Sequence, residues 1–144
     1  PFIPDYTFIK LKSKLLFGKS FNLKNPVTFN EKMNWLKLND RNPNYSILVD
    51  KIKVKEHVAK LIGEQYVVPV LTEWNDVNEI DFSILPDKCV LKTNHDSSGV
   101  IIYEKGESDI NEIKKRLNAR MHLFNYYYYE KEFPYKGVVK KIFA

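Results

Sequence analysis

The sequence predicts an α+β fold whose N-terminal third is helical, and three patterns support this. Apolar residues recur at helical spacing, with capping signals, over much of residues 1–63. Two short apolar runs then flank a small polar turn within 88–103, which is typical of a β-hairpin. A further helical pattern and a last apolar run follow the hairpin. This order of elements is that of an α+β protein.

Residues 5–17 are predicted to form a basic helix that ends at Gly18. Lys10, Lys12 and Lys14 lie largely off its apolar side. One interpretation is a helix packed on the core with its lysines in solvent. The other is a basic amphipathic helix that rests on an anionic membrane surface. The apolar side comprises Phe8, Leu11, Leu15 and Leu16.

Two more helices are predicted in the same third of the chain. Thr28 and Glu31 form a capping box, in which the hydroxyl accepts from the N–H of Glu31 and the carboxylate reaches back, so a helix is expected over 28–38. Another helix is expected over about 46–62, where Gly63 stops it. Its expected buried stripe is Val54, Val58, Leu61 and Ile62.

The remaining elements around the hairpin are less regular. Residues 65–71 are apolar but contain a proline, which predicts an edge strand or an extended connection. Ser108 is the expected N-cap of a helix, and residues 138–144 are the expected last strand. The four tyrosines at 126–129 are expected to anchor the helix end or, alternatively, to stack on a base or a sugar. The helix has an expected core stripe of Ile110, Ile113, Leu117, Met121 and Phe124.

The first hairpin strand carries a lysine among apolar residues. The period of two places Val90, Lys92 and Asn94 on one face and the residues between them on the other. Burying an ammonium group is costly unless an anion meets it, so Lys92 favours a phosphate-like ligand. Backbone N–H groups of the turn 96–99 would add donors. The alternative is a strand lysine whose ammonium simply reaches water.

Composition narrows the function classes. The net charge is +5 and the pI about 9.1, but the lysines are dispersed among 18 acidic residues, which disfavours a nucleic-acid partner. The single Cys89 is expected to be a buried thiol in a reducing cytoplasm. The three histidines show no metal-ligand spacing with it. No apolar run is long enough to span a membrane.

Several separate motifs, in one order, resemble the TupA-like ATP-grasp family. This family is associated with the synthesis of bacterial cell-surface polymers, and some members are labelled glycosyltransferases. The resemblance covers nearly all 144 residues. The motifs that carry it are Pro26–Lys32, Trp35–Leu38, Asp40–Pro43, Asp50–Lys51, Leu91–Gly99, Asn125–Tyr129 and Phe133–Lys136.

The resemblance implies an ATP-grasp-like small subdomain at 64–144, a mostly antiparallel sheet backed by helices, preceded by a helical region at 1–63. The chain starts without methionine and stops in an apolar run, so we expect an incomplete fold that lacks its second half. The residues that bind Mg²⁺ are expected in that missing half. The fragment alone is therefore expected to be inactive.

The resemblance also implies an ATP site. Lys51 would reach the phosphates, Lys92 would bind the α and β phosphates, and the hairpin loop would cover the β and γ phosphates. Asp96 would repel phosphate unless Mg²⁺ or a lysine intervenes. His95 would donate to phosphate or, as the favoured alternative, brace the loop through a backbone carbonyl. The loop residues in this prediction are Asn94, His95, Asp96, Ser97, Ser98 and Gly99.

The implied activity of the complete protein is ATP-dependent ligation of a carboxylate to an amine in cell-surface polymer synthesis. Its partners would be a nucleotide and an anionic or glycan-linked acceptor. The expected location is the cytoplasm, with contact at the inner face of the membrane through residues 5–17. Two alternatives remain: a glycosyltransferase-type enzyme of surface polysaccharide synthesis, and a non-catalytic membrane-peripheral binding module.

Overall fold

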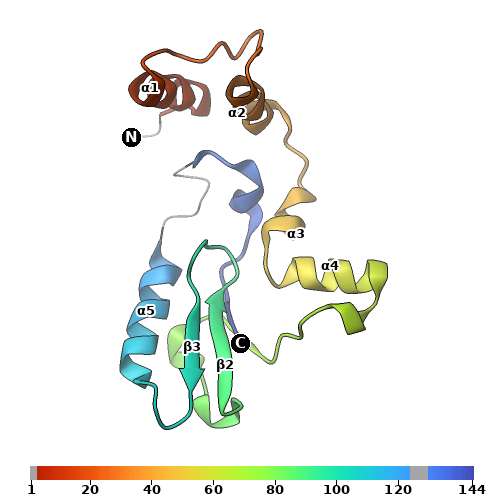
Figure 1. The fold of residues 1–144 in the computed structure, drawn as a ribbon, viewed down its shortest axis with the longest axis vertical. Coiled ribbons are helices and arrows are strands. Elements are labelled where there is room, and N and C mark those ends of the chain that lie inside the picture. The colour runs from red at the N-terminus through yellow and green to blue at the C-terminus, as the bar shows by residue number, and fades with distance from the viewer. Residues whose placement is uncertain (1–2, 124–129) are drawn as a thin grey trace.

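The computed structural model describes residues 3–123 and 130–144 and confirms the α+β class. Helices α1 and α2 lie together at one end of an elongated molecule, α3 and α4 follow along one side, and the sheet with α5 forms the other end (Figure 1). The helices are α1 (Asp5–Phe17), α2 (Phe29–Asn39), α3 (Tyr45–Val49), α4 (Lys53–Ile62) and α5 (Ile110–His122). The strands are β1 (Glu73–Trp74), β2 (Lys88–Thr93), β3 (Ile101–Glu104) and β4 (Ile142–Phe143).

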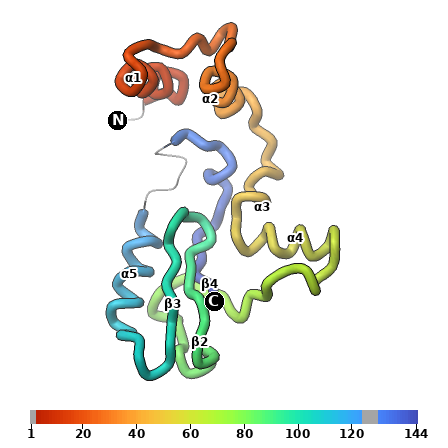
Figure 2. Tube along the Cα trace, viewed as in Figure 1, coloured from red at the N-terminus to blue at the C-terminus, as the bar shows by residue number. Residues whose placement is uncertain are grey.

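The four strands form one antiparallel sheet in the order β1-β4-β2-β3. The predicted hairpin is present as β2 and β3, with Leu91 opposite Ile101. The last strand is confirmed but short, and it lies between β1 and β2, so that the C-terminus ends beside the middle of the sheet (Figure 2). Helix α5 packs on one face of the sheet, and the main core lies between them. This core includes Trp74, Val77, Ile80, Leu85, Leu91, Ile101, Tyr103, Ile113, Leu117 and Ile142.

The single helix expected over 46–62 is wrong, because the chain turns between α3 and α4. Asp50 causes the break: its Oδ1 accepts hydrogen bonds from the backbone N–H groups of Ile52 at 3.0 Å and Lys53 at 3.3 Å. A buried aspartate side chain that accepts from backbone N–H groups two and three residues later competes with continued helix formation. Lys51 therefore lies in a turn rather than on a helix face.

The interpretation in which the apolar side of the helix 5–17 packs on the core is wrong for most of that side, although the bounds of the helix and its end at Gly18 are confirmed. Ile9 and Ser13 are the buried residues, and Ile9 packs with Phe21 and Leu23 in a small second cluster. Leu11, Leu15 and Leu16 are exposed, and only Phe8 of the predicted set contacts this cluster. The C-terminal part of the stripe expected for 46–62, Leu61 and Ile62, is exposed as well.

The capping box predicted at Thr28 and Glu31 is confirmed at the start of α2. The Glu31 carboxylate also accepts from the backbone N–H groups of Asn22 and Val27, so it holds the preceding loop against the helix. These hydrogen bonds lower the pKa of Glu31 from 4.5 to about 2. A carboxylate that accepts several N–H groups is stabilised in its charged form.

The N-cap predicted at Ser108 is wrong by one residue. Asp109 caps α5 by accepting from the N–H groups of Asn111 and Glu112, whereas the Ser108 hydroxyl accepts from the N–H of Glu104. Ile113 and Leu117 of the predicted stripe are buried. Of the two predictions for residues 65–71, the extended connection is confirmed, apart from a short 3₁₀ turn at its start. Phe124 and the tyrosines 126–129 lie outside the described residues.

Candidate functional site

The outward face of β2 carries Lys92. Strand alternation buries Leu91 and Thr93 completely on the α5 side and leaves Val90 39% exposed on the other, as the period of two predicts. Lys92 lies on this open face, half-buried, opposite Phe143 of β4. Within the part of the chain that the structure describes, its ammonium has no hydrogen-bond or ion-pair partner.

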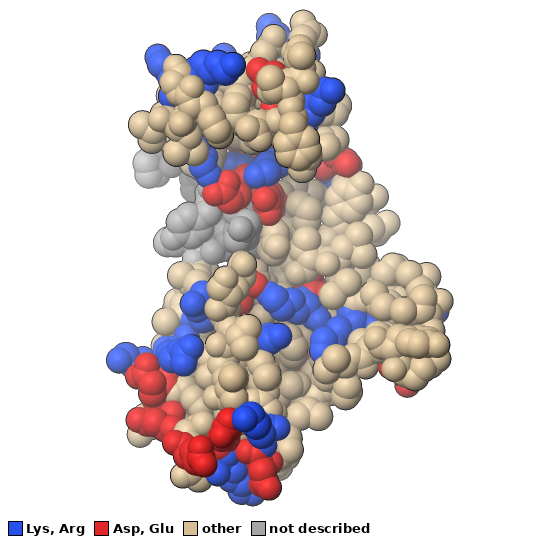
Figure 3. All heavy atoms as spheres, in the orientation of Figure 1, with Lys and Arg blue, Asp and Glu red and all other residues tan. Residues whose placement is uncertain are grey.

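Two more lysines approach Lys92 from the segment that leads into α4. The backbone N–H of Lys51 donates to Asn94, two residues after Lys92, and the Lys55 ammonium lies over the ring of Phe143, which pairs with Lys92 in the sheet. Burial lowers the pKa of both Lys51 and Lys55, and the positive charge of Lys92 lowers each further, which agrees with this proximity. We call these three residues the lysine cluster. Lys and Arg spheres gather across the middle of the molecule at the level of α4 (Figure 3). Three neighbouring ammonium groups favour a multiply charged anion between them.

Lys51 is held by the hairpin loop. Its ammonium donates to the backbone carbonyl of Asp96 and lies 3.8 Å from the Asp96 carboxylate. The backbone N–H of Lys51 donates to the carbonyl of Asn94 at 3.1 Å, which joins the turn to the end of β2. Burial lowers the pKa of Lys51, Asp96 opposes this shift, and Lys92 lowers the pKa further.

Lys55 reaches the same region from the first turn of α4. Its ammonium donates to the carbonyl of Val68 at 2.8 Å and lies 5.6 Å from the centre of the Phe143 ring. Burial first, and then the charge of Lys92, lower the pKa of Lys55. Because Phe143 pairs directly with Lys92 in the sheet, the aromatic ring lies beside both lysines. The predicted site residues did not include Lys55.

The loop carboxylate points into the protein. The Asp96 side chain is 6% exposed and lies between Lys51 and Arg120, whose Nη1 is 3.5 Å from Oδ2. Arg120 also donates to the carbonyl of Ser97 at 3.4 Å. Lys51 therefore neutralises Asp96. A nearby lysine or Mg²⁺ was the condition under which we expected the loop to accept a phosphate beside this carboxylate. Arg120, on α5, is a loop-supporting residue that the sequence did not single out.

A side chain at position 99 is excluded by packing and not by backbone conformation. A Cβ atom at Gly99 would lie 2.1 Å from Asp96 Oδ2, so only glycine leaves room for the buried carboxylate. The positive φ of the loop occurs at Ser98, at 67°, and not at Gly99. Ser97 and Ser98 form the exposed tip, and their backbone N–H groups donate to no other described residue. These N–H groups are free to bind an external acceptor.

Asn94 is fully engaged inside the protein. Its Nδ2 donates to Asp50 Oδ2 at 3.1 Å and to the Val139 carbonyl at 2.8 Å, and its Oδ1 accepts from the Lys141 N–H at 2.8 Å. The side chain is buried. Asn94 thus ties β2 to the segment before β4 and to the turn that carries Lys51. The structure places it as a support for the lysine cluster rather than on the open face.

His95 is buried beneath the loop. Among the described residues, neither ring nitrogen has a hydrogen-bond partner of normal geometry, and the hydroxyl of neighbouring Thr93 has none either. Burial and then the charge of Lys140 lower the pKa of His95, while Asp96 and the backbone of Arg120 oppose the shift. The ring is therefore held in its neutral form more strongly than a free histidine.

The described residues hold no group of three or more His, Cys, Asp or Glu side chains that could bind a metal ion. No helix in the described part of the chain is long and apolar enough to cross a bilayer. Cys89 of β2 is half-buried against the core, and burial raises the pKa of its thiol.

A family model described as TupA-like ATPgrasp matches residues 31–144, which include every residue of the predicted site. The chain belongs to this family. No curated protein and no solved structure matches it. ATP-grasp proteins generally depend on ATP and Mg²⁺, and the lysine cluster suits a polyphosphate because Lys92 lacks an anionic partner within the described residues. Helix α1 and the loop that follows it precede the matched region.

Proposed function

We propose that this TupA-like ATP-grasp protein binds the phosphates of ATP at the lysine cluster. The observation that supports this most is Lys92, a half-buried residue whose ammonium has no anionic partner among the described residues and which is flanked by two further lysines. Mutual repulsion makes such a cluster unfavourable when empty, and a polyphosphate relieves it. The exposed loop tip at Ser97 and Ser98 would add backbone N–H donors.

The proposed reaction class is ATP-dependent ligation. Transfer of the γ-phosphoryl group to a carboxylate would release ADP and form an acyl phosphate, and attack by an amine would then form the amide and release inorganic phosphate. Catalysis of this kind depends mainly on positioning and on neutralisation of phosphate charge. Lys51 and Lys92 would supply that charge, with Lys55 beside them. Mg²⁺ would add further neutralisation.

The internal contacts of the site suit this role. Asn94 and Asp50 hold the Lys51 turn against β2, while Asp96 holds the Lys51 ammonium at the loop. A fixed arrangement of charges stabilises a transferring phosphoryl group, because the charged side chains do not have to move during the reaction. We further propose that the acceptor is anionic or glycan-linked and that the pathway makes a bacterial cell-surface polymer. The resemblance to the family motivates this assignment.

Thermal unfolding of the purified protein with a panel of nucleotides tests the proposal. Mg-ATP at a hundredfold excess over its dissociation constant should stabilise the protein by roughly 2.7 kcal/mol. ADP should stabilise it less, because one phosphate fewer meets the lysine cluster. UDP- and GDP-sugars should give no shift. A shift with a nucleotide sugar and none with ATP would overturn the ligase proposal in favour of a glycosyltransferase.

A further inference from the structure

The net positive charge of the chain lies at one end, although basic residues occur throughout. Residues 1–39 contain seven lysines and two acidic residues, a net charge of +5, whereas residues 40–144 contain 16 basic and 16 acidic residues. The formal net charge of +5 thus belongs entirely to the segment that forms α1, α2 and the loop between them. The rest of the molecule is neutral overall, with positive and negative side chains mixed at the opposite end (Figure 3).

The two acidic side chains of this segment are engaged internally. Asp5 lies 3.1 Å from Nη2 of Arg41 and 3.4 Å from the ammonium of Lys131. The Glu31 carboxylate accepts from backbone N–H groups at both ends of the loop before α2. Neither carboxylate therefore offsets the lysines on the outer surface.

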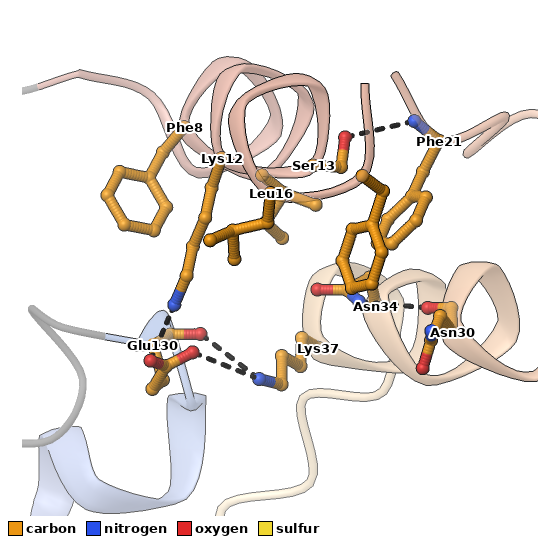
Figure 4. Close-up of a pocket in the computed structure, with 11 residues that line it drawn as sticks. Phe8, Lys12, Ser13, Leu16, Phe21, Asn30, Asn34, Lys37 and Glu130 are labelled. Atoms are coloured by element: carbon orange, nitrogen blue, oxygen red, sulfur yellow. Dashed lines mark hydrogen bonds and ion pairs between the residues drawn. The ribbon is translucent and has the colours of Figure 1, made fainter. Parts of the chain in front are cut away.

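Two of the seven lysines also point inward. Lys12 and Lys37 converge from α1 and α2 on Glu130, at 2.5 Å and 3.9 Å, across a cavity of about 190 Å³ (Figure 4). The Ser13 hydroxyl, on the same helix as Lys12, accepts from the N–H of Phe21 and fixes the loop after α1. These contacts fix α1 and α2 relative to each other. The other lysines, Lys10, Lys14, Lys19, Lys24 and Lys32, are left for the outer surface.

Apolar side chains accompany these outer lysines. Leu15 is 85% exposed, and Leu11, one turn earlier on α1, is 56% exposed. Lys14 lies next to Leu15 in sequence, and Lys19 follows the end of the helix. Further large apolar side chains are exposed on the same two helices and their loop. They include Val27, Phe29 and Trp35, whereas Leu16 and Phe17 line the cavity between the helices.

We propose that α1 and the loop after it dock on an anionic lipid bilayer surface. Exposed leucines and aromatic residues beside lysines, with no opposing free carboxylate, are the features that let a helix lie in the interface of such a membrane. Each lysine near an anionic leaflet contributes about 1 kcal/mol of attraction, and the leucines add apolar burial. The location of +5 at this end matches an anionic surface better than a second copy of the same positive face.

Co-sedimentation with lipid vesicles tests this docking. The protein should sediment with vesicles of phosphatidylcholine and phosphatidylglycerol at low salt, and much less with phosphatidylcholine alone or at high salt. Lys14→Gln with Lys19→Gln should reduce the partition coefficient roughly thirtyfold. Leu11→Ser with Leu15→Ser should reduce it roughly tenfold or more.

A matched pair provides the control. Leu61 and Leu71 are 69% and 52% exposed but lie outside the α1–α2 end, so Leu61→Ser with Leu71→Ser should leave vesicle binding unchanged. Three results would overturn the proposal. They are an equal loss of vesicle binding in the Leu11/Leu15 and Leu61/Leu71 variants, equal binding to neutral and anionic vesicles, and no binding to either kind of vesicle. A dimer in analytical ultracentrifugation that the Leu11 and Leu15 substitutions dissociate would also overturn it, since that face would then belong to a second copy.

Discussion

The side chain of Asn94 donates to the buried carboxylate of Asp50 across 3.1 Å, and this contact joins the end of β2 to the turn between α3 and α4. Both partners are buried, and each makes further hydrogen bonds to backbone groups. The pair sets the spacing between Lys92, two residues before Asn94, and Lys51, one residue after Asp50. The lysine cluster depends on a polar contact that is itself remote from the open surface.

The first prediction concerns that pair. Asn94→Ala should destabilise the protein by about 2–3 kcal/mol, because a buried carboxylate and two backbone groups lose their partner. Urea unfolding measures the change. The matched control is Asn118→Ala on the exposed face of α5, which should change stability by less than about 0.5 kcal/mol. Similar losses for both asparagines would show that Asn94 has no special structural role.

The second prediction concerns Gly99. Gly99→Ala should weaken Mg-ATP binding, because its Cβ would displace the Asp96 carboxylate from Lys51 and Arg120. The effect should be smaller when Asp96 is already alanine, since the colliding oxygen is then absent. Ser97→Ala, at the exposed loop tip, serves as the control. Additive effects of the Gly99 and Asp96 substitutions on nucleotide affinity would contradict the packing account.

The third prediction concerns pH. The pKa of His95 is lowered by folding from 6.5, so below pH 6.5 the unfolded chain binds a proton that the folded state resists. The contribution of neutral His95 to the stability of the folded state is therefore complete above pH 6.5, and it is lost as the pH falls toward the lowered pKa. His95→Phe should flatten this part of the stability profile, measured by urea unfolding across mildly acidic pH. His57→Phe, at an exposed position, should keep the slope of the unmodified protein.

Local features of the fold could be predicted from the sequence, and features set by distant contacts could not. The capping box at Thr28 and the β2–β3 hairpin depend on residues close together in the chain, and both are present. The break at Asp50 escaped prediction because helix periodicity shows neither the bonds of its Oδ1 to Ile52 and Lys53 nor the contact of its Oδ2 with Asn94, 44 residues away. Helix periodicity also misplaced the buried side of α1, since Ile9 contacts a loop that has no periodic pattern of its own.

The same distinction applies to the site. Lys92 stood out because a lysine in an apolar strand is unusual, and the structure does leave it on the open face. The neighbourhood of Lys55 could not be predicted, because β4 brings Phe143 between the strand and α4 only in the folded chain. The sequence likewise gave no sign that Arg120 of α5 supports the loop carboxylate of Asp96.

Isothermal titration of Mg-ATP against single lysine variants tests the phosphate site most directly. Lys92→Ala should weaken binding by about 2 kcal/mol, roughly 30-fold, because a charge-assisted contact to phosphate is lost. Lys88 lies on the same face of the same strand but is 68% exposed and paired with Glu104, so Lys88→Ala should leave the affinity within about twofold. Equal affinities of the Lys92 variant, the Lys88 variant and the unmodified protein would contradict the assignment of Lys92 to the ATP site.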